Sequence, residues 1–208
     1  MTILTKEIAH ELVKEQGSDI VIPDVYTSIA DSAFESVGFS SKEGTTRFPD
    51  LTSVIIPDSI TSIGDRAFAL NNLTSVVIPD SVTEFIGEQQ FRSNKLVDIT
   101  LPKKLKEISP SAFIANQLRS IDIPNTVTTI HDSAFAGNQL ESVEIPDSVE
   151  YITNAAFHDN RLTSVKIPDS VTLIGNIAFT ENNLNGVEIP EGTTLLGGSQ
   201  FDPNVQIT

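Results

Sequence analysis

Apolar residues along the chain follow one pattern that returns at a nearly constant step. Each copy opens with Leu-x-x-Val-x-Ile-Pro, as in residues 73–79 and 162–168. Alternating apolar positions such as Val76 and Ile78 predict a strand with one buried face, which the proline ends because it cannot donate to a ladder. A fixed period in this range predicts a solenoid in which each coil packs only on its neighbours. The Ile/Leu-Pro junctions lie 22 residues apart, and once 23, at Pro57, Pro79, Pro102, Pro124, Pro146, Pro168 and Pro190.

The second half of each copy carries a phenylalanine and an asparagine at fixed positions. An apolar pair such as Ile60 and Ile63 precedes a tight bend, after which we expect a short helical turn bearing Ala-Phe. The phenylalanine predicts a stacked core spine and recurs at Phe34, Phe68, Phe91, Phe113, Phe135, Phe157, Phe179 and Phe201. An asparagine at the next corner can accept from one backbone N–H and donate to the next coil's carbonyl, which predicts an asparagine ladder. It recurs at Asn71, Asn94, Asn116, Asn138, Asn160 and Asn182.

The first 17 residues do not follow the repeat. Residues 5–16 place Ile8, Leu12 and Val13 on one stripe with charged residues opposite, and Gly17 follows as a C-cap. A solenoid exposes its first apolar layer unless another element covers it. We therefore expect an N-terminal capping helix within residues 1–17 of a single domain that spans residues 1–208.

The period breaks at three places along the predicted coils of residues 18–200. Twelve residues are inserted within 35–50, and such insertions map to loops on one face of a solenoid. One extra residue between Pro79 and Phe91 predicts a bulge at residues 83–85, and Gln90 replaces the usual alanine there. Residues 201–208 predict an irregular last strand, whose unpaired edge favours end-to-end self-association unless it is capped.

The combined Ile-Pro and Ala-Phe spacing resembles the BspA-like, Treponema-type leucine-rich repeats, from about Ile20 to Phe201. The resemblance implies an α/β repeat solenoid, coiled right-handed, with a parallel β-sheet on its concave face and short helical turns. Members of that family are often surface or adhesion proteins that bind other proteins. The resemblance therefore implies a protein partner, and it implies no cofactor.

Information about function is expected where side chains vary at a fixed outward position. The residue between Val and Ile of each strand points out of the sheet, and parallel neighbours lie about 4.8 Å apart. Down the coils this column holds Val21, Ile55, Val77, Thr100, Asp122, Glu144, Lys166, Glu188 and then Gln206. Its N-terminal part, Ile55, Val77 and Thr100, with the inserted Lys42, Arg47 and Phe48, is the candidate partner contact. The polar column of Asp122, Glu144, Lys166 and Glu188 follows, in which Lys166 can pair with both glutamates.

Composition excludes several other function classes. A formal net charge of −15 with no Lys/Arg cluster argues against nucleic acid, and no apolar run is long enough for a membrane span. The absence of cysteine excludes disulfides and thiolate chemistry, and the three histidines are not at metal-ligand spacing. No nucleophile elbow, phosphate loop or isolated carboxylate pair predicts an enzyme, including a sugar lyase. The charges in the outward column also argue against an ice-binding array.

The sequence thus predicts a non-catalytic scaffold for protein binding or adhesion. The alternative is a structural spacer of a larger protein that assembles end to end through its C-terminal strand. The N-terminus carries charges at Lys6, Glu7 and Glu11 where a signal peptide needs an apolar core. The chain as given is therefore expected in the cytoplasm by default, or at the surface if it belongs to a longer exported protein.

Overall fold

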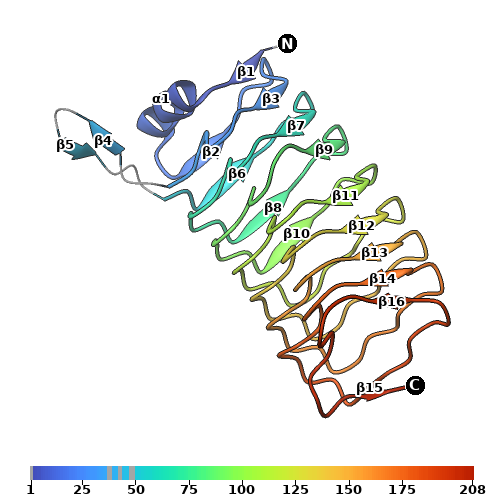
Figure 1. Cartoon of the computed structure of the whole chain (residues 1–208). Helices are drawn as coiled ribbons and strands as arrows, with labels where there is room; N and C mark the ends of the chain where they lie inside the picture. The colour runs from blue at the N-terminus through green and yellow to red at the C-terminus, as the bar shows by residue number, and fades with distance from the viewer. Residues whose placement is uncertain (1, 37–38, 42–43, 47–49) are drawn as a thin grey trace.

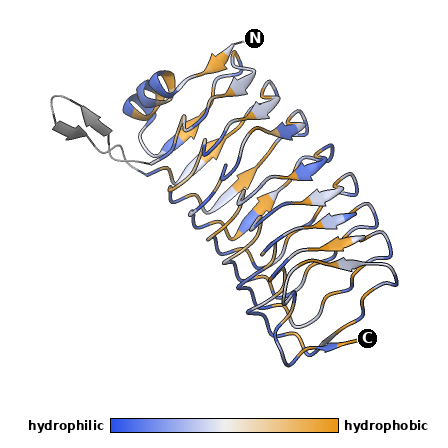
Figure 2. Cartoon of the chain, in the orientation of Figure 1, coloured by the Kyte–Doolittle hydropathy of each residue, from blue (hydrophilic) through white to orange (hydrophobic). Residues whose placement is uncertain are grey.

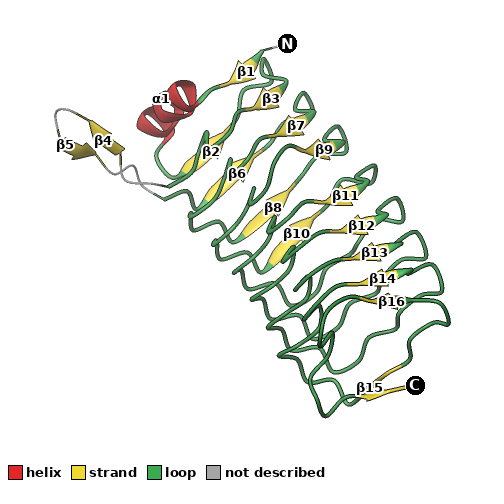
Figure 3. Ribbon diagram, viewed as in Figure 1, coloured by secondary structure: helices red, strands yellow, loops and turns green. Residues whose placement is uncertain are grey.

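The chain winds into an elongated solenoid whose coils carry two stacks of short strands (Figure 1). A computed structural model describes residues 2–36, 39–41, 44–46 and 50–208. Every strand pairing between coils is parallel, as predicted for a repeat in which each coil packs on its neighbours. Most of each coil lies in turns and loops, as Figure 3 shows.

The two stacks come from the two apolar segments of each repeat. The first stack, from the Leu-x-x-Val-x-Ile segments, contains β2 (Asp19–Val21), β6 (Ser53–Ile55), β8 (Ser75–Val77), β10 (Asp98–Thr100), β15 (Gly186–Val187) and β17 (Gln206–Ile207). The second stack, from the pair after the proline, contains β1 (Ile3–Leu4), β3 (Ser28–Ile29), β7 (Ser62–Ile63), β9 (Glu84–Phe85), β11 (Glu107–Ile108), β12 (Thr129–Ile130), β13 (Tyr151–Ile152), β14 (Leu173–Ile174) and β16 (Thr194–Leu195). Within the predicted insertion, β4 (Phe39–Ser41) and β5 (Gly44–Thr46) form an antiparallel hairpin.

The predicted N-terminal helix is present as α1 (Lys6–Gln16). It buries Ala9, Leu12 and Val13 against the first coil, while Figure 2 shows mostly hydrophilic residues along the rest of the helix. Gly17 ends the helix at φ 79°, and its N–H donates to the Val13 carbonyl at 2.8 Å. The helix therefore covers the first apolar layer.

The N-terminal edges of β2 and β3 are also covered. The side-chain amide of Gln16 accepts from the Val21 N–H at 2.7 Å and donates to the Val21 carbonyl at 3.2 Å. These bonds satisfy the edge of β2 that no strand pairs. At the edge of the second stack, β1 pairs with β3. Strand addition at this end is blocked for β2 and β3, as natural proteins commonly arrange for edge strands.

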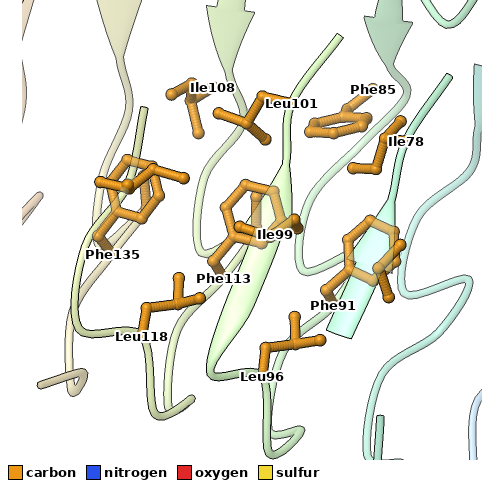
Figure 4. Close-up of a cluster of buried hydrophobic side chains, with 14 of the residues drawn as sticks. Ile78, Phe85, Phe91, Leu96, Ile99, Leu101, Ile108, Phe113, Leu118 and Phe135 are labelled. Atoms are coloured by element: carbon orange, nitrogen blue, oxygen red, sulfur yellow. The ribbon is translucent and has the colours of Figure 1, made fainter. Parts of the chain in front are cut away.

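The predicted phenylalanine spine runs the length of the solenoid. Successive rings stack with centroids 5.2 to 5.7 Å apart and planes within 15° of parallel. Figure 4 shows Phe91, Phe113 and Phe135 in a row, with Phe85 of β9 making edge contacts to the first two rings. Each stacked pair contributes about 0.5–1.5 kcal/mol beyond the area it buries.

The Ala-Phe segments, in which we expected short helical turns, form consecutive β-turns instead. The N–H groups of Arg66, Phe68 and Leu70 donate to carbonyls of the next coil at 2.8 to 2.9 Å. The alternate N–H groups, of Ala67 and Ala69, turn back to carbonyls three residues earlier. A helical turn would direct all of these donors along its own axis, so bonding to the next coil excludes it. Arg66 and Leu70 accordingly adopt positive φ, as do the equivalent residues of the five coils that follow, such as Ser111 and Ala115.

The predicted asparagine ladder is confirmed at the next corner, with one difference in direction. Asn94 Oδ1 accepts from the Leu73 N–H at 3.1 Å, and its Nδ2 donates to the carbonyls of Phe68 and Phe91 at 2.9 and 3.1 Å. We expected the amide to donate to a carbonyl of the next coil, but Phe68 belongs to the preceding one. The same bonds recur at Asn71, Asn116, Asn138, Asn160 and Asn182.

A second polar ladder lies three residues before the phenylalanine, and sequence reasoning missed it. The Asp31 carboxylate accepts from the Asp65 N–H at 2.9 Å, and Asp65 accepts from the Glu88 N–H at 3.0 Å. Farther along, Asp132 accepts from the Asn154 N–H, and Asn154 Oδ1 accepts from the Asn176 N–H. The available signal was an Asp or Asn at Phe minus three in these coils.

The extra residue of the third coil is placed differently from the prediction. Glu84 and Phe85 pair in register with Ser62 and Ile63, so the expected bulge at 83–85 is absent. The N–H of Ile86 still bonds to Ile63, and the extra residue is Gly87 at φ 78°. A Cβ on Gly87 would lie 2.7 Å from the Asp65 Cβ, so this position needs glycine.

The bulge at Gly87 interrupts the second stack. Strands β9 and β11 belong to separate sheets, and a cavity of about 330 Å³ lies between them, lined by Phe85, Lys106 and Ser109 among others. The side chain of Gln90 fills the position of the usual alanine, and its Nε2 donates to the Ile86 carbonyl at 3.0 Å. Gln200 makes the same bond to Leu196 in the last coil. Both departures from Ala therefore stabilise an irregular bend.

The C-terminal end forms the predicted last strand, but in another register. β17 pairs with β15 so that Gln206 lies opposite Gly186 and Ile207 opposite Val187. Gln206 therefore does not continue the outward column behind Glu188, and Thr208 takes that place because its carbonyl accepts from the Ile189 N–H. The Asp202 carboxylate sets this turn by accepting from the N–H groups of Glu181 and Asn182.

Candidate functional site

Three aliphatic side chains lie exposed in a row on the first stack. Val21 pairs with Ile55 across β2 and β6, and β8, which carries Val77, lies beside β6 (Figure 1). Their exposed fractions are 52, 61 and 66 %, whereas the central residue of each of these strands is buried. Thr100 of β10 pairs with Val77 and extends the row. We call Val21, Ile55 and Val77 the apolar strip.

Hydrogen-bonded polar residues flank the apolar strip on the same strands. Asp19 Oδ1 accepts from the hydroxyls of Thr52 and Ser53 at 2.7 and 2.8 Å. The bonds from Thr52 and then Ser53 lower the pKa of the Asp19 carboxyl. Ser75 and Asp98 follow in the same column, and both are exposed. A neutral hydrophobic row thus lies beside a fixed carboxylate and hydroxyl row.

The remaining predicted contact residues belong to the insertion. Lys42, Arg47 and Phe48 lie outside the described residues. The described backbone of the insertion is the β4–β5 hairpin, which follows the first coil and precedes β6. The structure therefore brings together Val21, Ile55, Val77 and Thr100, and the contribution of the three insertion residues stays a prediction.

The charged part of the outward column has a different backbone. Asp122, Glu144 and Lys166 are all exposed, but their segments form no strand between β10 and β15. Among the described residues, Lys166 makes no ion pair with Glu144 or with Glu188. The predicted pairing is absent because these segments are not hydrogen-bonded at the spacing of a parallel sheet.

Grooves open between coils where this pairing is lost. One of about 170 Å³ lies between the segments that carry Asp122 and Glu144, with Ile121, Ile123 and Pro146 also lining it. A second, of about 300 Å³, involves Lys166 and Glu188. The C-terminal half of this face is therefore corrugated and charged, whereas the N-terminal half consists of the strand pairs β2–β6 and β8–β10 with aliphatic side chains.

The histidines take part in local contacts. His131 Nε2 lies 2.8 Å from Glu107 Oε2, and His158 Nδ1 lies 2.9 Å from the Thr180 hydroxyl. No group of three or more His, Cys, Asp or Glu side chains suited to a metal occurs in the described part of the chain. Over the same residues, no helix has the length and apolar character needed to cross a bilayer.

Two segments, residues 45–161 and 128–208, match the BspA type leucine rich repeat region in six copies. The chain belongs to the BspA-type leucine-rich repeat family. The match begins inside the insertion and covers every coil after it, so the resemblance noted from the Ile-Pro and Ala-Phe spacing is confirmed. No curated protein matches this BspA-type chain in sequence.

Solved structures share the fold of this BspA-type protein. A leucine-rich repeat protein from Bacteroides ovatus matches with a TM-score of 0.73 and 22 % identity, over 94 % of this chain and 52 % of its own. A leucine rich cell surface protein from Faecalibacterium prausnitzii matches with a TM-score of 0.57 and 25 % identity, over 94 % of this chain and 54 % of its own. The pneumococcal vaccine antigen PcpA matches with a TM-score of 0.55 and 22 % identity, over 92 % of this chain and 57 % of its own. The chain thus spans about half the length of each.

Proposed function

We propose that the chain is a non-catalytic scaffold that binds another protein through the apolar strip, with an adhesive role. The observation that carries the proposal is the alignment of Val21, Ile55 and Val77 at 52 to 66 % exposure on adjacent strands. Contiguous exposed apolar residues with a polar border are typical of protein contacts. The insertion residues Lys42, Arg47 and Phe48 belong to the proposed contact because the insertion follows the coil that carries Val21.

The fold supports display rather than chemistry. Each strand is held by neighbours on both sides through the phenylalanine spine and the asparagine ladder, so outward side chains are presented on a rigid frame. The Faecalibacterium prausnitzii relative is described as a cell surface protein, which supports adhesion as the setting. We propose the same exposed location for the protein that contains this chain.

The test removes apolar surface while keeping the strands. In the double variant Ile55→Thr/Val77→Thr, each replacement is β-branched and matches Thr100, which the column already contains. The wild type and the variant are immobilised, exposed to a host-cell surface extract, and the retained proteins are quantified by mass spectrometry. The variant replaces the ethyl group of Ile55 and one methyl group of Val77 with hydroxyls, and this loss of apolar carbons, at about 0.8 kcal/mol each, should weaken retention of the true partner by at least roughly tenfold.

The matched control for this test is Leu70→Ser. Leu70 is 41 % exposed on the turn after Phe68, and Ser93 occupies the same place one coil later. This control should retain the partner as the wild type does. Equal retention by the strip variant and the wild type would remove the apolar strip as the binding face.

Self-association through the C-terminal end is a second candidate, favoured by one observation. Leu195, Leu196 and Ile207 are 38, 46 and 52 % exposed, and β16 and β17 are the last described strands of their sheets. Sedimentation equilibrium of the wild type and of Ile207→Lys tests it. Dissociation of an oligomer by the lysine supports this candidate, and a wild type that is monomeric at every concentration eliminates it.

A further inference from the structure

We propose that the partner segment is amphipathic along its length, with aliphatic or aromatic side chains on the apolar strip and Lys or Arg over Asp122 and Glu144. This inference rests on the proposed function, because it names the chemistry of what the same face binds. The proposed ligand is a peptide segment of a partner protein, with an apolar part followed by a basic part.

The charge of the face selects a cationic partner. Asp122 and Glu144 lie in successive coils at the same outward position, and no ion pair neutralises either among the described residues. Asp98, beside Thr100, adds a third exposed carboxylate between them and the strip. The whole chain carries a net charge of −15. A basic side chain placed here would relieve repulsion between neighbours, whereas an acidic one would add to it.

The shape of the groove selects a long side chain. Ile121, Ile123 and Pro146 contribute apolar walls, while Asp122, Glu144 and Asn125 contribute polar groups. Ile121 and Ile123 keep 7 % of their surfaces exposed, as expected for walls that solvent only partly reaches. Lys and Arg combine an apolar stem with a charged head, so they match apolar walls with carboxylates nearby. A short polar side chain would leave the walls uncovered.

The repeat sets the distance between the two parts of the ligand. Val77 and Asp122 are two coils apart, which is about 10 Å, because β8 and β10 pair at the spacing of parallel strands and the rings of the next step, Phe113 and Phe135, stack 5.6 Å apart. An extended segment covers about 10 Å in three residues, and a helix covers it in about seven. The ligand should therefore carry its first basic residue about three positions from its last apolar anchor if extended, or about seven if helical.

Selection from a displayed library of random 16-residue peptides, against the intact protein, tests the inference without assuming a partner. Recovered clones should join at least two aliphatic or aromatic residues to at least two Lys or Arg residues at one of these spacings. A synthetic peptide of the consensus is then titrated by fluorescence anisotropy. Its affinity should fall about three- to tenfold for Asp122→Asn/Glu144→Gln, since each exposed charge pair contributes modestly.

The control for the charge change is Glu141→Gln/Glu150→Gln. It removes the same number of charges at exposed positions outside the outward column, so it should leave the affinity within about twofold of the wild type. If both double variants weaken the peptide equally, only the overall charge attracts it, and the groove assignment is overturned. Clones without basic residues overturn the inference as well.

The outcomes separate this inference from the proposed function. Peptides that need Ile55 and Val77 but not Asp122 and Glu144 leave the binding face standing and remove the cationic half. Peptides that bind Ile55→Thr/Val77→Thr as tightly as the wild type contradict both. A selection that yields no binder dependent on either pair also contradicts both.

Orientation gives an independent readout, because the chain has no cysteine of its own. A nitroxide is attached at Ser75→Cys or at Ser164→Cys, two exposed serines of the column beside the apolar strip and the charged residues. The NMR signals from the apolar half of the isotope-labelled peptide should broaden when the nitroxide is at position 75. Those from the basic half should broaden when it is at position 164. The reverse pattern would overturn the proposed direction.

Discussion

The N-terminal and C-terminal halves of the solenoid share one core but differ in how their outer strands are held. In the N-terminal half both stacks are hydrogen-bonded, through β2–β6 and β8–β10 on one side and β1–β3–β7–β9 on the other. In the C-terminal half, β11, β12, β13, β14 and β16 form one unbroken sheet, while the first stack has no strand between β10 and β15. The change occurs around the coil that follows the Gly87 bulge.

The two halves share one core and differ in the outward column, but the column alone does not decide pairing, because β6 and β8 lie side by side unpaired although they carry Ile55 and Val77. Phe68 and Phe157 are fully buried in the two halves, and their stacking distances are alike. Outside, Val21 and Ile55 are β-branched neighbours that favour a pleated sheet. Asp122 and Glu144 are like charges in the equivalent places, and like charges opposite each other destabilise a sheet. The like charges of Asp122 and Glu144 thus disfavour pairing at this step and also form part of the surface offered to a partner.

The largest expected effect tests whether the core is shared. Phe68→Ala and Phe157→Ala each leave a cavity in the spine and should each cost about 3–5 kcal/mol in free energy of unfolding. Urea denaturation followed by circular dichroism measures both. Because the stacking is alike, the two losses should agree within about 1 kcal/mol, the spread of such measurements. A much smaller loss at Phe157 would show that the C-terminal core is looser.

An intermediate effect should follow from making the two outward columns alike. The double variant Asp122→Thr/Glu144→Thr supplies β-branched residues like Thr100 and should stabilise the fold by about 0.5–1 kcal/mol. Amide hydrogen exchange at Ile123 and Ile145 should slow as the strands pair. Glu141→Thr/Glu150→Thr is the control, because neighbouring coils already have Thr163 and Thr128 at these places. Slowing in the control alone would contradict the role of the column.

The smallest expected effect concerns the second polar ladder, in acid. Burial of Asp132 opposes ionisation, but hydrogen bonds from Thr153 and Asn154 outweigh it and lower the pKa of the carboxyl. Such a group stabilises the fold above its unfolded pKa, about 3.9, and this contribution is lost as pH falls through the lower folded pKa. Asp132→Asn, which copies Asn154, should therefore lose less stability than the wild type below about pH 4.

Urea midpoints at pH 7, 4 and 2.5 measure this effect, with Asp58→Asn at an exposed turn as the matched control. If the urea midpoint of Asp132→Asn falls between pH 4 and pH 2.5 as much as that of the wild type, Asp132 does not contribute to the loss of stability in acid.

Elements that depend on one residue type at a fixed step could be predicted from the sequence. The phenylalanine spine and the asparagine corner follow from what each side chain must do in a repeating coil, and the helix stripe of Ile8, Leu12 and Val13 follows from the need to cover the first coil. The Asp/Asn ladder was missed because its residue type varies and because Glu88 and Pro110 interrupt it. Two residue types that share one acceptor function do not stand out in a search for identity.

Features that depend on backbone path could not be predicted as well. Counting residues shows that the third coil has one extra, but only the hydrogen bonds place it at Gly87. Val205 and Ile207 copy the strand pattern, yet the turn fixed by Asp202 shifts the register by two residues. For the candidate site, the sequence predicted the exposed row of Ile55, Val77 and Thr100. The predicted ion pairs of Lys166 were wrong because the prediction assumed that the strands of the first stack are hydrogen-bonded along the whole solenoid.

The direction of the asparagine bonds has a consequence for how the protein is made. Asn138 completes the corner of Leu118, 20 residues earlier, and Asn160 then completes the corner of Leu140. When a nascent chain has emerged from the ribosome up to any one asparagine, the backbone groups of every earlier corner already have their amide partner. Only the newest corner still waits for the asparagine of the coil to come. Because α1 precedes the first coil, each new coil forms against structure that is already complete, so folding can proceed in step with translation.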